Sequence, residues 1–114
     1  MSFHRDKYQT FATLLEQFRS EIVTKQLDAP GMQHHLVSLK QFFQLQILPL
    51  TEETSREQSY RTEMSKQLRL LEIDVMFYQG ARQAATASER RNTISDRLST
   101  LTEYCQAILQ LQEP

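Results

Sequence analysis

Apolar residues recur at intervals of three and four along most of the chain, which is the spacing of amphipathic helices, and strand patterns are nearly absent. Pro and Gly interrupt this pattern at residues 28–31 and 48–49. Asp28 is placed to cap a helix whose first turn tolerates Pro30, and the residue before Pro49 avoids helical angles. We therefore predict an all-α fold, an up-down four-helix bundle. Its helices are expected at about 3–26, 29–48, 52–84 and 87–111.

Two short segments have the pattern of a capping box, in which Ser or Thr is followed three residues later by Gln or Glu. They are Ser55–Gln58 and Thr86–Glu89, and they predict the beginnings of the third and fourth helices. The chain has no internal repeat and no long linker between the helices. We therefore predict a single helical domain over residues 1–114.

The first and fourth predicted helices each carry one apolar stripe. In the first helix the stripe consists of Tyr8, Phe11, Leu15, Phe18 and Ile22. In the fourth helix it consists of Ile94, Leu98, Leu101, Cys105 and Ile108. A single stripe is typical of a helix that packs on one side and exposes the other side to water.

The second and third predicted helices carry more apolar residues than one face can hold. Their main stripes are Met32, Leu36, Leu39, Phe43 and Ile47, and then Tyr60, Met64, Leu68, Leu71, Val75 and Tyr78. Further apolar or small residues point in other directions. These are Phe42, Leu45 and Leu48 in the second helix, and Leu70, Ile73, Phe77, Gly80, Ala81 and Ala84 in the third.

Two interpretations of this surplus remain open. In the first, the two helices are central and each contacts two neighbours. In the second, Phe42, Leu45, Ile73 and Phe77 form a homodimer or partner surface, because a large exposed apolar patch usually marks an interaction site. In either case Gly80 and the nearby alanines are expected to allow close helix approach.

Composition and charge exclude several classes of protein. The chain has 13 Lys and Arg against 14 Asp and Glu, so its formal charge of -1 argues against a non-specific binder of nucleic acid or anionic lipid. The single cysteine, Cys105, fits a reducing compartment and excludes a Cys-rich zinc fold. The beginning of the chain lacks a signal peptide's apolar core, and the most apolar stretch, 39–50, is too short and polar to span a membrane. We expect a cytoplasmic protein.

The sequence offers little catalytic or metal-binding chemistry. His34 and His35 are adjacent and so point about 100° apart on a helix, which prevents them from sharing one metal ion. Cys105 lies in an apolar stripe with no basic neighbour to lower its pKa, which favours a buried structural cysteine. No Gly-rich phosphate loop is present. We expect a protein that is not an enzyme and that uses no metal or cofactor.

Carboxylates are expected to form ordinary surface pairs. Glu57 lies four residues from both Glu53 and Arg61, a spacing typical of a solvated helix face. Glu72 and Asp74 are expected to pair with Arg69 or Arg82.

Arginines also gather at the turn between the third and fourth helices: Arg82, Arg90, Arg91 and Arg97. This cluster is either a solvated turn or a cationic lip, lined by Tyr78 and Gln79, that suits a carboxylate-bearing peptide.

Several segments resemble the family of the cyanobacterial heterocyst frequency control protein PatD. The resemblance runs over most of the chain; its main stretch is Ser55–Ala84, and it is most specific from Leu68 to Ala84. Supporting segments are Leu27–Gly31, Phe42–Phe43 with Leu48–Leu50, and Thr93–Leu98. The resemblance implies a regulator that limits how many cells of a filament become heterocysts. It also implies binding to the division protein FtsZ and modulation of its polymer assembly, with no reaction catalysed.

The resemblance assigns no binding residues, so the expected surface follows from helical positions alone. It comprises Ile73, Phe77, Tyr78, Arg82, Arg90 and Arg91, with Phe42 and Leu45 at a dimer surface if the chain forms one. A dimer would present two equal sites and bridge two filaments. Two alternatives are an adaptor that sequesters another regulator and a transcription cofactor, against which the near-zero charge counts.

Overall fold

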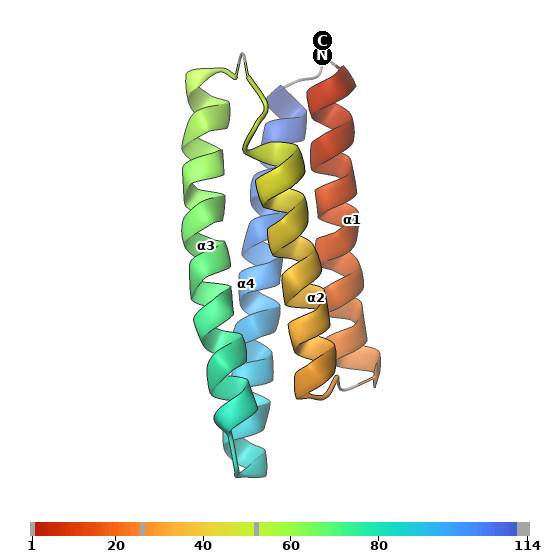
Figure 1. Ribbon diagram of the computed structural model, residues 1–114, viewed down its shortest axis with the longest axis vertical. Coiled ribbons are helices and arrows are strands. Elements are labelled where there is room, and N and C mark those ends of the chain that lie inside the picture. Colours follow the sequence, from red (N-terminus) through yellow and green to blue (C-terminus); the bar gives the residue numbers. More distant parts are fainter. Residues whose placement is uncertain (1, 26, 52, 112–114) are drawn as a thin grey trace.

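The chain folds as four helices that run side by side, up and down, in a computed structural model that describes residues 2–25, 27–51 and 53–111 (Figure 1). The helices are α1 (Ser2–Lys25), α2 (Ala29–Phe42) with the π-helix η1 (Phe43–Ile47), α3 (Ser55–Gly80) and α4 (Ala84–Leu111). No strand occurs in these three described segments. The predicted all-α, up-down four-helix bundle is confirmed.

Each helix of the bundle has two neighbours. Helix α4 packs against α1 and α3, and α2 with η1 packs against α1 and α3 from the other side. The molecule is elongated, with extents of 48 × 22 × 19 Å. The end of the α3–α4 hairpin projects beyond the α1–α2 connection (Figure 1). This overhang leaves the last turns of α3 with α4 as their main neighbour.

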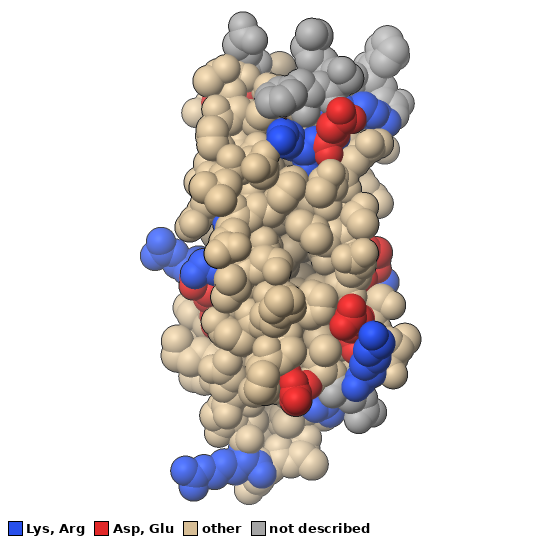
Figure 2. All heavy atoms as spheres, turned by 45° about the vertical axis from the view of Figure 1, so that its right-hand side comes forward, with Lys and Arg blue, Asp and Glu red and all other residues tan. Residues whose placement is uncertain are grey.

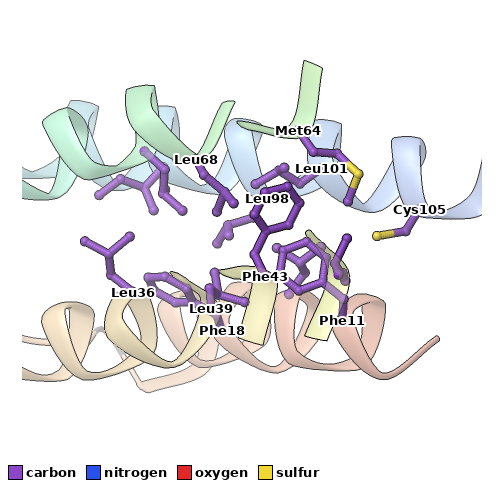
Figure 3. Close-up of a cluster of buried hydrophobic side chains, with 14 of the residues drawn as sticks. Phe11, Phe18, Leu36, Leu39, Phe43, Met64, Leu68, Leu98, Leu101 and Cys105 are labelled. Carbon is purple, nitrogen blue, oxygen red and sulfur yellow. The ribbon is translucent and has the colours of Figure 1, made fainter. Parts of the chain in front are cut away.

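The predicted stripes form one core between the helices (Figure 3). All five stripe residues of α1, all five of α2 with η1, and all five of α4 are buried. In α3 the four central stripe residues are buried, while Tyr60 and Tyr78 at its ends are only partly buried. Leu50 adds to the core from the connection that follows η1. A spacing of three and four was therefore sufficient to identify the inward face of every helix.

The beginning of α2 follows the sequence prediction. The Asp28 carboxylate accepts a hydrogen bond from the Gly31 backbone N–H at 2.9 Å, and Pro30 lies in the first turn. A Cβ at Gly31 would lie 2.9 Å from Cδ2 of Leu27, so a larger residue here would require the Leu27 side chain to shift. The helix predicted to residue 48 continues to Ile47, but its last turn is a π-helix. There the Leu48 N–H donates to the Phe43 carbonyl at 2.9 Å, just before Pro49.

The third helix is shorter at both ends than the predicted range of 52–84. It begins at Ser55, and its N-cap is Thr54, whose hydroxyl accepts from the Glu57 N–H at 3.1 Å; residue 52 lies outside the described residues. It ends at Gly80, where Ala81 takes an extended conformation with φ -71° and ψ 126°. The Ala81 N–H closes the last turn on the Tyr78 carbonyl at 3.2 Å.

The fourth helix begins three residues earlier than predicted. It starts at Ala84 instead of residue 87, and the Ala87 N–H already bonds to the Gln83 carbonyl at 3.0 Å. Thr86 therefore lies inside the helix, and the predicted capping box at Thr86 is wrong. The turn between α3 and α4 uses only three residues, so the chain ahead of Thr86 is already helical.

Candidate functional site

Helix α3 exposes four apolar side chains on the side opposite the core, and we name them the α3 strip. They are Leu70, Ile73, Met76 and Phe77, with exposed fractions of 38, 39, 64 and 51%. Leu71 and Val75 on the opposite side of the same turns are buried. Sequence patterning identified three members but missed Met76, although its position three residues after Ile73 places it on the same face.

Two arginines of α4 stack on aromatic rings of α3. The guanidinium carbon of Arg90 lies 4.7 Å from the centre of the Phe77 ring, and that of Arg91 lies 5.9 Å from the centre of the Tyr78 ring. Such cation–π contacts hold the guanidinium group over the ring face. Arg90 therefore places a positive charge at the edge of the α3 strip, beside its largest apolar side chain.

Tyr78 and Arg91 have a structural role at the same end of the bundle. The Tyr78 hydroxyl donates to the Leu27 carbonyl at 2.8 Å and accepts from Nη1 of Arg91 at 3.5 Å. Both side chains are half-buried. They tie the α3–α4 hairpin to the α1–α2 connection, so this part of the predicted surface helps to hold the strip in place. Arg82, by contrast, lies exposed in the turn.

The carboxylates closest to the strip are neutralised by other partners than predicted. Glu72 pairs with Lys40 of α2, and Oδ2 of Asp74 lies 2.6 Å from Nε of Arg97. The predicted pairing of Glu72 and Asp74 with Arg69 or Arg82 is wrong, because both carboxylates lie at the helix interfaces whereas Arg69 points to solvent. The edge of the α3 strip is consequently cationic.

Phe42 and Leu45 do not join the α3 strip, so the single four-residue patch considered above is two surfaces. The Phe42 ring is half-buried and stacks on Phe11 of α1, with 6.0 Å between ring centres and 8° between planes. Leu45 is 69% exposed beside α1. Contact of α2 with two neighbouring helices therefore explains why Phe42 is apolar. It does not explain the exposed apolar side chains of Leu45, Ile73 and Phe77.

The small residues at the end of α3 do not mediate close helix packing. A Cβ built on Gly80 would meet no atom within 4 Å, and both Gly80 and Ala84 are exposed. The expectation of close helix approach at these residues is wrong for the helices of the bundle itself. They lie where the hairpin overhangs the rest of the bundle, so no third helix reaches them.

At the opposite end of the bundle, the predicted solvated face of α3 is buried. Glu57 and Arg61 are only 4 and 8% exposed. The Tyr8 hydroxyl donates to Oε2 of Glu57 at 2.9 Å, and Nδ1 of His4 lies 3.1 Å from the same oxygen. Burial raises the pKa of Tyr8 far above its usual value, and the Glu57 carboxylate adds to the effect. The sequence spacing of Glu57 and Arg61 did not predict this buried cluster, because the partners of Glu57 come from α1.

Cys105 is fully buried in α4, as predicted, and burial raises the pKa of its thiol to about 12. We expect the native thiol to resist alkylation at neutral pH, because only the thiolate attacks, and to react once the chain is unfolded.

The same pKa shift makes stability depend on pH. In the unfolded chain the thiol has its usual pKa of 9.0, so on raising the pH the unfolded state releases this proton first. Stability should therefore fall as pH rises from about 9 towards 12, by up to about 1.4 kcal/mol per pH unit.

Mass spectrometry after a short alkylation pulse, with and without urea, measures the first effect. Urea unfolding as a function of pH measures the second, with Cys105→Ala as the control that should weaken the alkaline loss. Rapid alkylation of the folded chain would contradict the prediction.

The described residues hold no group of three His, Cys, Asp or Glu side chains arranged to bind a metal ion. None of the helices described combines the length and apolar composition needed to cross a membrane.

Comparison with protein-family models, curated proteins and solved structures finds no match.

Proposed function

We propose that the chain is a non-catalytic cytoplasmic regulator that binds the division protein FtsZ, modulates its polymer assembly and thereby limits heterocyst frequency. The observation that carries a binding role is the α3 strip with Arg90 stacked on Phe77. The choice of partner rests on the segments that resemble the PatD family.

The surface favours a partner with an apolar anchor flanked by carboxylates. Exposed apolar side chains gain free energy when a partner removes them from water. Arg90 is already oriented by Phe77, so a carboxylate of the partner meets a guanidinium group that has little side-chain freedom left to lose. Arg82, exposed in the adjoining turn, adds a second positive charge.

Phe77→Asp should abolish pelleting of the purified protein with polymerising FtsZ, because it places a negative charge at the centre of the apolar contact. We expect a loss of affinity of at least roughly 30-fold, which corresponds to about 2 kcal/mol and is typical of a central interface residue. Val23→Asp is the matched control: Val23 is 67% exposed but lies on α1, so this variant should pellet like the unchanged chain.

Three further observations make the experiment decisive. An unrelated tubulin-like polymer should not carry the protein into the pellet. Reversing Arg82 and Arg90 to Glu should weaken binding most at low salt, where ion pairs are least screened. Both variants should keep their helical circular dichroism. Failure of the unchanged chain to pellet at any salt concentration would contradict the proposed partner, and normal pelleting of Phe77→Asp would contradict the proposed surface.

A further inference from the structure

Helix α3 has a second face with the spacing of a coiled coil. The residues that form it, which we name the α3 seam, are Leu70, Ile73, Phe77 and Gly80. They follow one another at alternating intervals of three and four residues. The buried face of the same helix alternates in the same way, through Met64, Leu68, Leu71 and Val75. Because this alternation keeps one side of a helix against a neighbouring helix, α3 has one helix-packing face towards the core and another towards solvent.

The α3 seam is open along its whole length. The side chains of Leu70, Ile73 and Phe77 are exposed, and Gly80 is exposed where the hairpin projects beyond the α1–α2 connection (Figure 1). A Cβ at Gly80 would meet no atom within 4 Å, so there is room one turn beyond Phe77 for a large side chain of a docking helix. At 1.5 Å per residue the seam is about 15 Å long, which matches about three turns of a partner helix.

Two arginines flank the α3 seam, one at each edge. Arg69 precedes Ile73 by four residues and lines a hollow with Lys40, so it marks the edge that faces α2. Arg90 marks the edge formed by α4, where it stacks on the seam. Within the described residues neither guanidinium group has a carboxylate partner. Glu89, next to Arg90 in the sequence, lies about 100° away around α4. The seam is therefore apolar along its middle and cationic along both edges.

We propose that the α3 seam binds an acidic amphipathic helix of another protein. Apolar residues of that helix, spaced alternately by three and four, pack on Leu70, Ile73 and Phe77. Its Asp and Glu residues flank this contact and pair with Arg69 and Arg90. The helix occupies the surface assigned to FtsZ above, so its binding rests on the proposed function for the site but not for the identity of the protein that carries the helix.

A helix fits this surface better than an extended segment does. An extended peptide needs partners for its backbone N–H and C=O groups, which the edge of a sheet supplies. The backbone groups of α3 are hydrogen-bonded within the helix, and no strand occurs in the described part of the chain. A partner helix satisfies its own backbone groups, so only side chains meet at the contact.

Charge favours an acidic partner over a second copy of this chain. In a coiled coil, the residues that flank the apolar seam form the ion pairs that select the partner. A second copy would bring the same arginines and few carboxylates to meet them. Glu72 and Asp74, which belong to the same turns of α3, are already held by Lys40 of α2 and Arg97 of α4.

Synthetic peptides test the proposal without FtsZ. The probe is a fluorescently labelled helical peptide of about three heptads, with Leu at the two seam positions and Glu at the flanking positions. Its binding is measured by fluorescence anisotropy at low and at high salt. We expect it to bind, and to bind less tightly at high salt. A peptide with Lys in place of each Glu should bind at least roughly tenfold more weakly, because like charges then meet. A peptide of the same composition in scrambled order should not bind.

Ile73→Glu places a charge at the centre of the seam and should weaken binding of the acidic peptide by at least roughly tenfold. Leu45→Glu is the matched control and should bind normally. Leu45 is 69% exposed, but it lies on the side formed by α1 and α2. Figure 2 looks onto that side, whose middle is uncharged and whose Lys, Arg, Asp and Glu residues lie towards the margins.

Arg69→Glu tests the edge of the seam and leaves the apolar contact in place. It should weaken binding of the acidic peptide and strengthen binding of the Lys peptide, because it exchanges attraction for repulsion in one case and the reverse in the other. Arg56→Glu changes the net charge equally at an exposed position near the beginning of the same helix, so it should leave this preference unchanged. Circular dichroism confirms that each variant is folded.

Several results would overturn the proposal. They are no binding of the acidic peptide, equal binding of the acidic, Lys and scrambled peptides, and unchanged affinity in both Ile73→Glu and Arg69→Glu. In sedimentation velocity, a dimer of the chain that is lost in Ile73→Glu would identify a second copy as the occupant instead. Peptide binding without pelleting on FtsZ supports the acidic helix and contradicts FtsZ as its source. Pelleting without peptide binding keeps FtsZ as the partner and overturns the acidic helix.

Discussion

Arg61→Ala is expected to lower the free energy of unfolding by about 3 kcal/mol, because a hydrogen bond from a charged group contributes about 1.5–3 kcal/mol and Arg61 makes two to buried carbonyls. Arg61 is 8% exposed and donates from Nη2 to the Leu48 carbonyl at 2.7 Å and from Nη1 to the Leu50 carbonyl at 3.2 Å. Its Nη1 also lies 3.5 Å from Oε2 of Glu53. The variant leaves two carbonyl groups and a carboxylate without this donor.

The size of the effect follows from the position of Arg61 under the connection between η1 and α3. The π-helix and Pro49 end the helical hydrogen bonding there, so the backbone carbonyls depend on a side chain for partners. Arg61→Lys should recover only part of the loss, because a single ammonium group does not reproduce the planar fork that reaches both carbonyls.

Urea unfolding followed by circular dichroism measures this prediction. Arg56→Ala is the matched control, because Arg56 lies on the same helix but is exposed, and it should change stability by no more than about 0.5 kcal/mol. A loss below about 1 kcal/mol in Arg61→Ala would show that water replaces the guanidinium group at both carbonyls.

Helix periodicity predicted the fold and the core because each helix buries one continuous face. In α1 and α4 that face is a single stripe, and every predicted member of it is buried. The end of α3 and the beginning of α4 were harder to predict, since residues 81–84 contain neither Pro nor a capping pattern. Next to this turn, Tyr78 donates a hydrogen bond to the Leu27 carbonyl of the α1–α2 connection, a tertiary contact that the local sequence does not reveal.

The buried polar residues show more clearly what the local spacing of residues cannot predict. The spacing of Glu57 and Arg61 matches a solvent-exposed pair, yet both are buried by contacts with residues about 50 positions away or with the preceding connection. The α3 strip was largely identified because its members follow helical spacing. Which surplus apolar residues stay exposed depends on where the neighbouring helices end, and the sequence of α3 alone does not contain that information.

Leu98→Ala is expected to cost about 2–5 kcal/mol of stability, the range for a leucine truncated in a core that only partly collapses. Leu98 is fully buried near the middle of α4. Figure 3 shows it pointing inward beside Leu101, towards Phe43 on the opposite pair of helices. Because α4 packs against both α1 and α3, a cavity at this position removes contacts on two sides of the bundle.

Leu111→Ala is the matched control, since Leu111 belongs to the same helix but is 40% exposed at its end. Its cost should be well below that of Leu98→Ala when both are compared by urea unfolding. Both variants remove the same atoms from a leucine, so their difference mainly reports burial. Equal losses would mean that the end of α4 contributes as much to the core as its centre, contrary to the burial pattern.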